Sequence, residues 1–297
     1  MSEPLAKFYE ATLRVILVIK ADYPEFLCDF HFNLVNSLPE HCVQLRNIIL
    51  SAQPRNIPCI DPFAKNLKVD TLPEINQPPR SQSNYENYLV FMNLREDLER
   101  YFRTKEQALI QIIADKMMQS EEIINGRKRI NSSIFNAVAL FIQNCAHQNK
   151  SKQQVAQKEC YEMLKQIILI LSSETRLCLL NSIVNELRYI NCHTYFYSWM
   201  VIYLFADIDE SVQEQITRIL IERLQTHEPH PWGLCITFRE LLQNPKYNFA
   251  KKSFVLKSQV VIEQLMQTKL SSFNSFWTNN KQVLMGPPQV QQQIQHH

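Results

Sequence analysis

At four places in the sequence a histidine lies close to a cysteine or to another histidine, and such side chains could hold a metal ion. Structural zinc sites usually present their paired ligands on knuckles or short loops. Cys28 and His31 instead share one apolar helical pattern, and the sequence has no His-Glu-x-x-His motif. We therefore interpret these residues as packing and surface residues, and predict neither a metal nor a cofactor. The four pairs are Cys28 with His31, His41 with Cys42, Cys192 with His193, and His227 with His230.

Glycine is scarce, which argues against several kinds of active site. The sequence has only Gly126, Gly233 and Gly286. Phosphate-binding loops and nucleophile elbows need glycine, because their backbones adopt positive φ or approach a ligand closely. A distant pairing such as Cys192 with His230 stays open, but no nucleophile at a strained turn can be identified. We predict a protein that is not an enzyme.

Charge and cysteine usage restrict the partners and the compartment. The 297 residues carry 31 basic and 29 acidic side chains, a net charge of +2, which gives no general attraction to nucleic acid or membranes. The eight cysteines form no Cys-x-x-Cys motif and are typical of buried, reduced thiols. The charged first twenty residues resemble neither a signal peptide nor a membrane span. We expect a cytoplasmic protein, with the nucleus as a second location.

Apolar residues recur every three or four positions along most of the chain, which predicts an all-α fold. Short connections favour HEAT-like stacked helical hairpins in one domain over residues 1–272. The glutamine-rich tail, residues 273–297, is predicted to be disordered. The polar segment 118–130, with Arg127 to Arg129 beside two glutamates, is predicted to be an exposed loop. The expected helices cover about 3–21, 24–39, 41–52, 85–102, 105–119, 131–148, 153–172, 174–190, 194–206, 210–226, 234–244 and 256–270.

Residues 54–79, called the strap here, cannot be helical. They contain six of the fourteen prolines, which lack a backbone donor and push the preceding residue out of the helical region. Apolar residues nevertheless recur along the segment, unlike in a loose linker. We predict an extended strap over a folded body, completed by backbone hydrogen bonds or by a bound partner. Its predicted anchors are Phe63, Leu67, Val69, Leu72 and Ile75.

Residues 194–206 are apolar on all sides, so we interpret their aromatic residues chiefly as core. Tyrosine is also a good anchor where a surface meets a partner. Tyr197 and Tyr203 are therefore predicted as partner-binding residues or strap anchors.

Several long strings resemble the C-terminal superfamily homology domain of the Not-one scaffold subunit of the CCR-Not deadenylase complex. The most diagnostic strings lie in and before the strap, and others return near the C-terminal end. Together they span about residues 12–268. They include residues 22–29, 44–47, 49–52, 54–56, 61–63, 66–70, 72–75, 187–189, 191–194, 203–206, 214–218, 222–224 and 230–234.

The resemblance implies a non-enzymatic scaffold module that docks the Not-two and Not-three/Not-five subunits through extended segments. It also implies a role in messenger RNA deadenylation and translational repression, with docking of short peptide motifs from RNA-bound repressors. A helical-repeat domain that binds RNA directly is the alternative, which the near-neutral charge disfavours.

Overall fold

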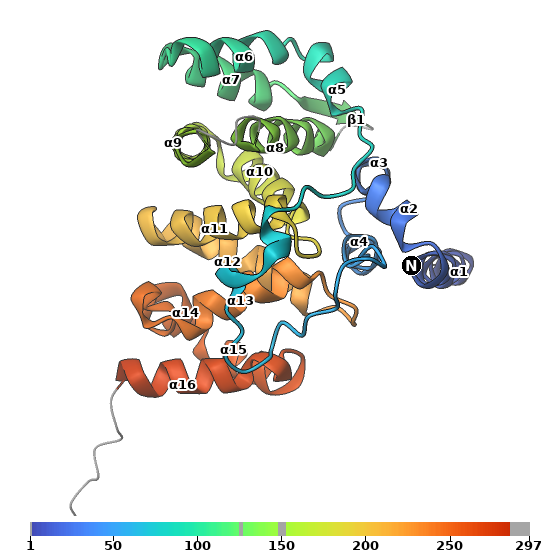
Figure 1. The fold of residues 1–297 in the computed structure, drawn as a ribbon, viewed down its shortest axis with the longest axis vertical. Coiled ribbons are helices and arrows are strands. Elements are labelled where there is room, and N and C mark those ends of the chain that lie inside the picture. The colour runs from blue at the N-terminus through green and yellow to red at the C-terminus, as the bar shows by residue number, and fades with distance from the viewer. Residues whose placement is uncertain (1, 125–126, 148–152, 286–297) are drawn as a thin grey trace, which may run out of the picture. The chain divides into compact units, whose positions relative to one another are not determined.

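A computed structural model describes residues 2–124, 127–147 and 153–285 of the chain (Figure 1). The chain divides into two compact units, residues 1–237 and 238–297, where one domain over 1–272 was expected. Helices dominate both units, which confirms the predicted all-α class.

The N-terminal helices of the first unit form a group whose sequence pattern is amphipathic. Helix α1 packs on α2 and α4, and α3 packs on α4 and α8. Leu27 and Cys28 of α2 are buried against Ala52 and Tyr189, so this group is tied to a segment far along the chain. The bounds are α1 (Glu3–Asp22), α2 (Pro24–Asp29), α3 (His31–Asn36) and α4 (Val43–Leu50).

The strap contains no α-helix, as its prolines require. It is not extended throughout, because two short 3₁₀ turns, η1 (Val69–Thr71) and η2 (Pro73–Asn76), interrupt it. Pro73 opens η2 at a position where its missing N–H costs nothing. Turn η2 lies against helix α11, which the strap crosses in Figure 1.

The body of the first unit is a stack of helical layers, in which α8 lies between α6 and α7 on one side and α10 on the other (Figure 1). Helix α8 packs against α5, α9 and α10, and its small residues Ala137 and Ala139 are fully buried. Helices α10, α11 and α12 begin with Ser172, Asn191 and Asp209 as side-chain caps, which satisfy N–H groups of the first turn. The bounds are α5 (Tyr85–Phe91), α6 (Arg95–Thr104), α7 (Ala108–Met118), α8 (Ser132–His147), α9 (Gln153–Ile170), α10 (Ser173–Asn185), α11 (Cys192–Asp207) and α12 (Glu210–Leu224).

The prediction of an exposed loop over residues 118–130 is wrong in part. This segment contains an antiparallel hairpin of β1 (Glu121–Ile124) and β2 (Arg127–Ile130). Glu121 pairs with Ile130 and Ile124 with Arg127. Isoleucine favours strands, but the charged residues between the isoleucines concealed this preference.

The second unit has an aromatic core. Helix α13 (Trp232–Gln243) enters it at Phe238, whose ring lies 5.1 Å from that of Phe273 and 6.1 Å from that of Phe249. Trp277 of α16 is 4% exposed and packs on Phe249. The other elements are η4 (Pro245–Tyr247), η5 (Phe249–Lys251), α14 (Ser253–Lys257), α15 (Gln259–Thr268), η6 (Ser271–Phe273) and α16 (Asn274–Met285).

The prediction of a disordered tail over residues 273–297 is wrong in part, because residues 274–285 form helix α16. Burial of Trp277 gives this stretch an apolar contact that the sequence pattern did not reveal. Residues 286–297 lie outside the described part of the chain.

A buried ionic cluster around Arg188 joins the N-terminal helices to the turn between α10 and α11. Arg188 is 2% exposed, and its Nη2 donates to the carbonyl of Cys28 at 3.0 Å. Its Nη1 lies 2.8 Å from Nδ1 and 3.0 Å from Nε2 of His31. Nδ1 also lies 3.1 Å from the carbonyl of Cys28, and Nε2 lies 3.7 Å from Glu186. A guanidinium and a carboxylate are thus buried together around one imidazole.

The pKa shifts agree with this arrangement of charge. Burial and the adjacent Arg188 lower the pKa of His31, which keeps the imidazole neutral. Burial by itself raises the pKa of Glu186, but His31 and Arg188 outweigh it and leave that pKa below its usual value.

The chain passes closely over the same turn at Gly233. The Gly233 N–H donates to the carbonyl of Arg188 at 2.7 Å. A Cβ at this position would lie 2.4 Å from Cγ2 of Thr194 and 2.9 Å from the carbonyl carbon of Leu187. Only glycine therefore permits this approach.

Replacing Arg188 by methionine tests the structural weight of the cluster. We expect Arg188→Met to lower the free energy of unfolding by about 3 to 5 kcal/mol, because Glu186 would remain buried without its cation. Urea denaturation monitored by circular dichroism measures the change.

The matched control is Arg14→Met, since Arg14 forms an exposed ion pair with Glu10 at 2.6 Å on α1. That variant should unfold close to wild type. Equal stability of both variants would show that the buried cluster is not needed to hold the fold.

Candidate partner-docking surface

The described residues offer no arrangement typical of nucleophilic catalysis. Burial raises the pKa of Cys28 to about 11 and that of Cys235 to about 12, so these thiols are protonated and weakly nucleophilic. His230 bonds through its ring to the carbonyl of Thr226, whereas Cys192 lies beside two other histidines, His147 and His193. His147 lies on α8, far from Cys192 and His193 in the sequence, so the sequence spacing did not predict that the three residues meet.

The predicted strap anchors are all half-buried. A further apolar contact, absent from the prediction, comes from Ile57, which packs on the cluster of Leu27, Cys28, Ala52 and Tyr189. The anchors are Phe63, Leu67, Val69, Leu72 and Ile75.

Hydrogen bonds hold the strap along its length. The Arg55 N–H donates to a carboxylate oxygen of Glu25 at 2.9 Å, near the start of the strap. The Tyr195 hydroxyl donates to Asp70 at 3.0 Å, and Cys192 N–H donates to the carbonyl of Gln77 at 2.9 Å. Backbone and side-chain bonds to α2 and α11 thus add to the apolar contacts.

An ion pair closes the end of the strap. Arg80 binds Asp29 through two parallel hydrogen bonds, Nε to Oδ1 at 2.9 Å and Nη2 to Oδ2 at 2.7 Å. The Arg80 N–H also donates to the hydroxyl of Tyr189 at 2.9 Å. This bidentate ion pair fixes the direction of the chain after the strap.

Helices α9 and α11 enclose an open groove of about 620 Å³, called the α9/α11 groove here. Trp199 and Tyr203 stack with ring centroids 3.7 Å apart and remain 38% and 37% exposed. Exposed, stacked aromatic rings with polar tips are typical of surfaces that anchor a partner. The groove is lined by Gln154, Gln157, Lys158, Tyr161, Glu162, Tyr195, Phe196, Trp199, Tyr203 and Asp207.

Polar groups keep the aromatic rings of the groove in place. The Tyr161 hydroxyl donates to Asp207 at 2.6 Å, and Lys165 lies 3.4 Å from the same carboxylate. Burial and the bond to Asp207 raise the pKa of Tyr161, so its hydroxyl stays a donor at neutral pH. The ring of Tyr161 meets that of Tyr203 edge-on at 6.2 Å. The groove is thus preformed, with little side-chain freedom left to lose on binding.

The structure separates the two predicted tyrosines. Tyr203 lies in the groove, but Tyr197 is fully buried and donates to the carbonyl of Ala139 at 2.6 Å, so it belongs to the core. The sequence did carry a signal for the groove residues, since Tyr195, Trp199 and Tyr203 are spaced by four and share one face of α11.

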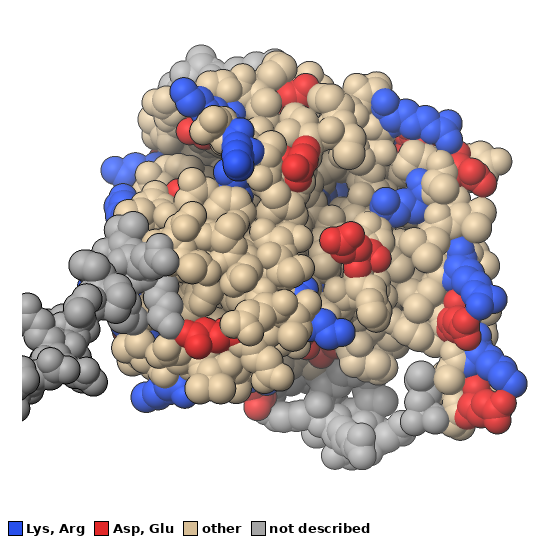
Figure 2. Space-filling view, turned by 90° about the horizontal axis from the view of Figure 1, so that it is seen from below, with Lys and Arg blue, Asp and Glu red and all other residues tan. Residues whose placement is uncertain are grey.

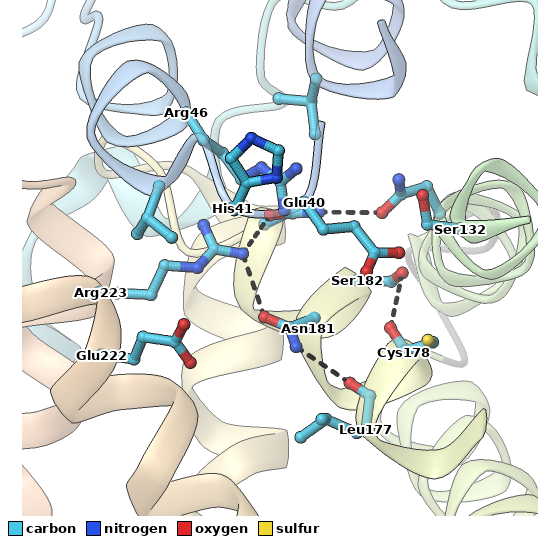
Figure 3. Close-up of a pocket in the computed structure, with 14 residues that line it drawn as sticks. Glu40, His41, Arg46, Ser132, Leu177, Cys178, Asn181, Ser182, Glu222 and Arg223 are labelled. Atoms are coloured by element: carbon cyan, nitrogen blue, oxygen red, sulfur yellow. Dashed lines mark hydrogen bonds between the residues drawn. The ribbon is translucent and has the colours of Figure 1, made fainter. Parts of the chain in front are cut away.

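A second, polar pocket of about 300 Å³ lies among α4, α8, α10 and α12 (Figure 3). Two buried arginines, Arg46 and Arg223, line it. Burial, followed by repulsion from Arg46, lowers the pKa of Arg223 to about 9, which still leaves it protonated at neutral pH. Glu40 and Glu222 also line the pocket and balance these charges.

Amide side chains continue from this pocket as a hydrogen-bonded chain through three helices. Arg223 Nη2 donates to Asn185 at 2.6 Å, Asn185 donates to Asn136 at 2.9 Å, and Asn136 donates to Asn36 at 2.7 Å. Because each step joins a different helix, we interpret this pocket as a structural joint.

Charge is mixed rather than concentrated on one face of the molecule (Figure 2). On the face drawn in Figure 2, acidic and basic side chains are interspersed around broad areas without charge. This agrees with the net charge of +2. In the described part of the chain, no helix has the length and apolar character needed to cross a bilayer.

Comparison with known proteins decides the family. The family described as "CCR4-Not complex component, Not1" matches residues 1–269, nine-tenths of the chain. The chain belongs to the Not1 family. Not1 proteins are non-catalytic scaffold subunits of the CCR4-Not complex, which agrees with the lack of catalytic motifs in the sequence.

Curated Not1 relatives are clearly similar in sequence. The chain is 38% identical over 263 residues to the CCR4-NOT transcription complex subunit let-711 of Caenorhabditis elegans, covering 86% of this chain and 10% of that protein. It is 32% identical over 294 residues to general negative regulator of transcription subunit 1 of Schizosaccharomyces pombe, covering 94% and 14%. The chain thus spans a small part of the length of these relatives.

Solved structures confirm that the Not1 likeness extends to the fold. The NOT1 superfamily homology domain from Chaetomium thermophilum matches with a TM-score of 0.81 at 29% identity, covering 94% of this chain and 56% of that one. A Not1 C-terminal domain in complex with Not4 matches with a TM-score of 0.79 at 27% identity, covering 89% and 55%.

Truncation of two strap anchors tests whether the strap contributes to folding. We expect Phe63→Ala and Leu67→Ala each to lower the free energy of unfolding by about 1 to 2 kcal/mol, roughly half the cost of truncating a fully buried side chain. Chemical denaturation and thermal melting measure the loss.

Phe91→Ala is the control, because Phe91 on α5 is 77% exposed and lies outside the strap. We expect Phe91→Ala to have the melting temperature of the wild type. Strap variants that also match wild type would show that the anchors add nothing to the stability of the isolated domain.

Proposed function

We propose that this chain is a partner-docking module of the CCR4-Not scaffold that receives the Not-two and Not-three/Not-five subunits. Docking would join these subunits to the complex that shortens messenger RNA tails and represses translation. The module itself contributes surfaces and no chemistry.

The α9/α11 groove is the observation that carries this proposal. Trp199 and Tyr203 present stacked, partly exposed rings beside the polar groups of Asp207 and Lys158. An extended peptide can place apolar side chains on such rings and satisfy its backbone at the polar edge. Because Tyr161 and Asp207 already fix the rings, binding need not pay for ordering them.

The family context supports recognition of protein partners. One similar structure is a Not1 C-terminal domain in complex with Not4, so a domain of this fold binds another subunit of the complex. By analogy, extended segments of Not-two, Not-three/Not-five or short motifs of RNA-bound repressors are the proposed ligands here. We expect this activity in the cytoplasm, with the nucleus as a second location.

Calorimetric titration with the C-terminal regions of Not-two and Not-three/Not-five tests the proposal. We expect binding at micromolar concentration or tighter, weakened at least tenfold in Trp199→Ala and Tyr203→Ala, because truncating an aromatic anchor typically costs more than 1 kcal/mol. Phe91→Ala, which removes an exposed ring on α5, should bind like wild type.

Two outcomes would contradict the proposal in different ways. Absence of micromolar binding by the wild-type chain would overturn docking of these subunits. If both groove variants bind with wild-type affinity, docking of the subunits would stand, but the α9/α11 groove would not be their binding site. Filter binding to RNA with a steep dependence on salt would favour the direct RNA-binding alternative.

A further inference from the structure

Three side chains with metal-binding atoms meet where the end of α8 approaches the start of α11. His147 is the last residue of α8, and Cys192 and His193 are the first two residues of α11. One ligand atom from each residue lies within 4.8 Å of those of the other two. Cys192 is buried and both histidines are half-buried, so the group is largely shielded from solvent.

The hydrogen bonds of His147 leave one of its nitrogens available. Its Nδ1 lies 2.8 Å from the carbonyl of Gln143, one helical turn earlier, and must carry the proton that it donates. Its Nε2 then holds a lone pair, and this buried atom makes no hydrogen bond of ordinary geometry among the described residues, although the ring lies near the backbone of Cys192. A histidine that ligates a metal characteristically donates its other N–H to a carbonyl in this way.

Metal binding requires neutral imidazoles from His147 and His193 and a thiolate from Cys192. A dication would displace the thiol proton and form a bond to the resulting thiolate.

We propose that His147, Cys192 and His193 form a zinc-binding site. Two imidazole nitrogens and one thiolate are a ligand set that suits Zn²⁺ and disfavours Mg²⁺ and Ca²⁺, which prefer oxygen. Tetrahedral bonds of about 2.0 to 2.3 Å need ligand atoms roughly 3.3 to 3.6 Å apart, so the three atoms close in by about an ångström. A water molecule completes the fourth position.

Zinc at this site would act as a clasp between distant parts of the first unit. The ring of His147 already packs on those of His193 and Phe196, with centroids 5.0 and 5.6 Å away. Cys192 also holds the strap, because its N–H donates to the carbonyl of Gln77. A bound ion would therefore fix the end of α8, the start of α11 and the end of the strap together.

Metal titration of the purified chain, first stripped of metal by a chelator, tests the site. We expect one equivalent of Zn²⁺ to bind in competition with a chromogenic chelator and to raise the melting temperature. Co²⁺ in place of Zn²⁺ should give a thiolate-to-metal charge-transfer band. Cys192→Ser should abolish that band and weaken Zn²⁺ binding at least tenfold, and His147→Gln should also weaken binding at least tenfold.

Cys59→Ser is the matched control, because Cys59 is an exposed free thiol outside the cluster. It should keep the stoichiometry, the affinity and the charge-transfer band. Circular dichroism of the metal-free variants verifies folding, and His147→Gln decides the outcome if Cys192→Ser fails to fold. The proposal is overturned if wild type binds no Zn²⁺ at micromolar concentration, or if a folded His147→Gln variant binds it as wild type does.

Discussion

The buried charge of Arg188 is the constraint on which the arrangement of the first unit depends. A guanidinium inside a protein must find both a counter-charge and hydrogen-bond acceptors, because its desolvation is otherwise very costly. Glu186, His31 and the carbonyl of Cys28 supply them, and they come from two distant parts of the chain. The N-terminal helices are thereby placed against the turn between α10 and α11. The same turn receives Gly233 and begins the helix that carries the aromatic groove.

The strap and the groove follow from that placement. Once α2 and α11 are fixed, the strap can lie across both, with Arg80 on Asp29 at its end and Gln77 on Cys192. Helix α11 then presents one face to the core through Tyr197 and the other to solvent through Trp199 and Tyr203. Helix α11 thus holds the two rings in fixed positions at the surface.

The sequence predicted features that depend on local physics. Proline excluded an α-helix from the strap, and apolar spacing located most of the helices. Features that depend on tertiary contacts escaped it. Residues 274–285 fold as a helix because Trp277 is buried against Phe249, and Tyr197 is core because α8 offers the carbonyl of Ala139. His147 could not be paired with Cys192, since they lie 45 positions apart in the sequence.

The central claim is that partner subunits lie in the α9/α11 groove. Site-specific photo-crosslinking addresses it most directly, with a photoreactive amino acid placed at Trp199 and, in a separate sample, at Phe91. Each sample is irradiated with the C-terminal regions of Not-two and Not-three/Not-five. The account predicts a covalent adduct from position 199 and none from position 91. An adduct from position 91 alone, or none from position 199 under conditions where the subunits bind, would contradict it.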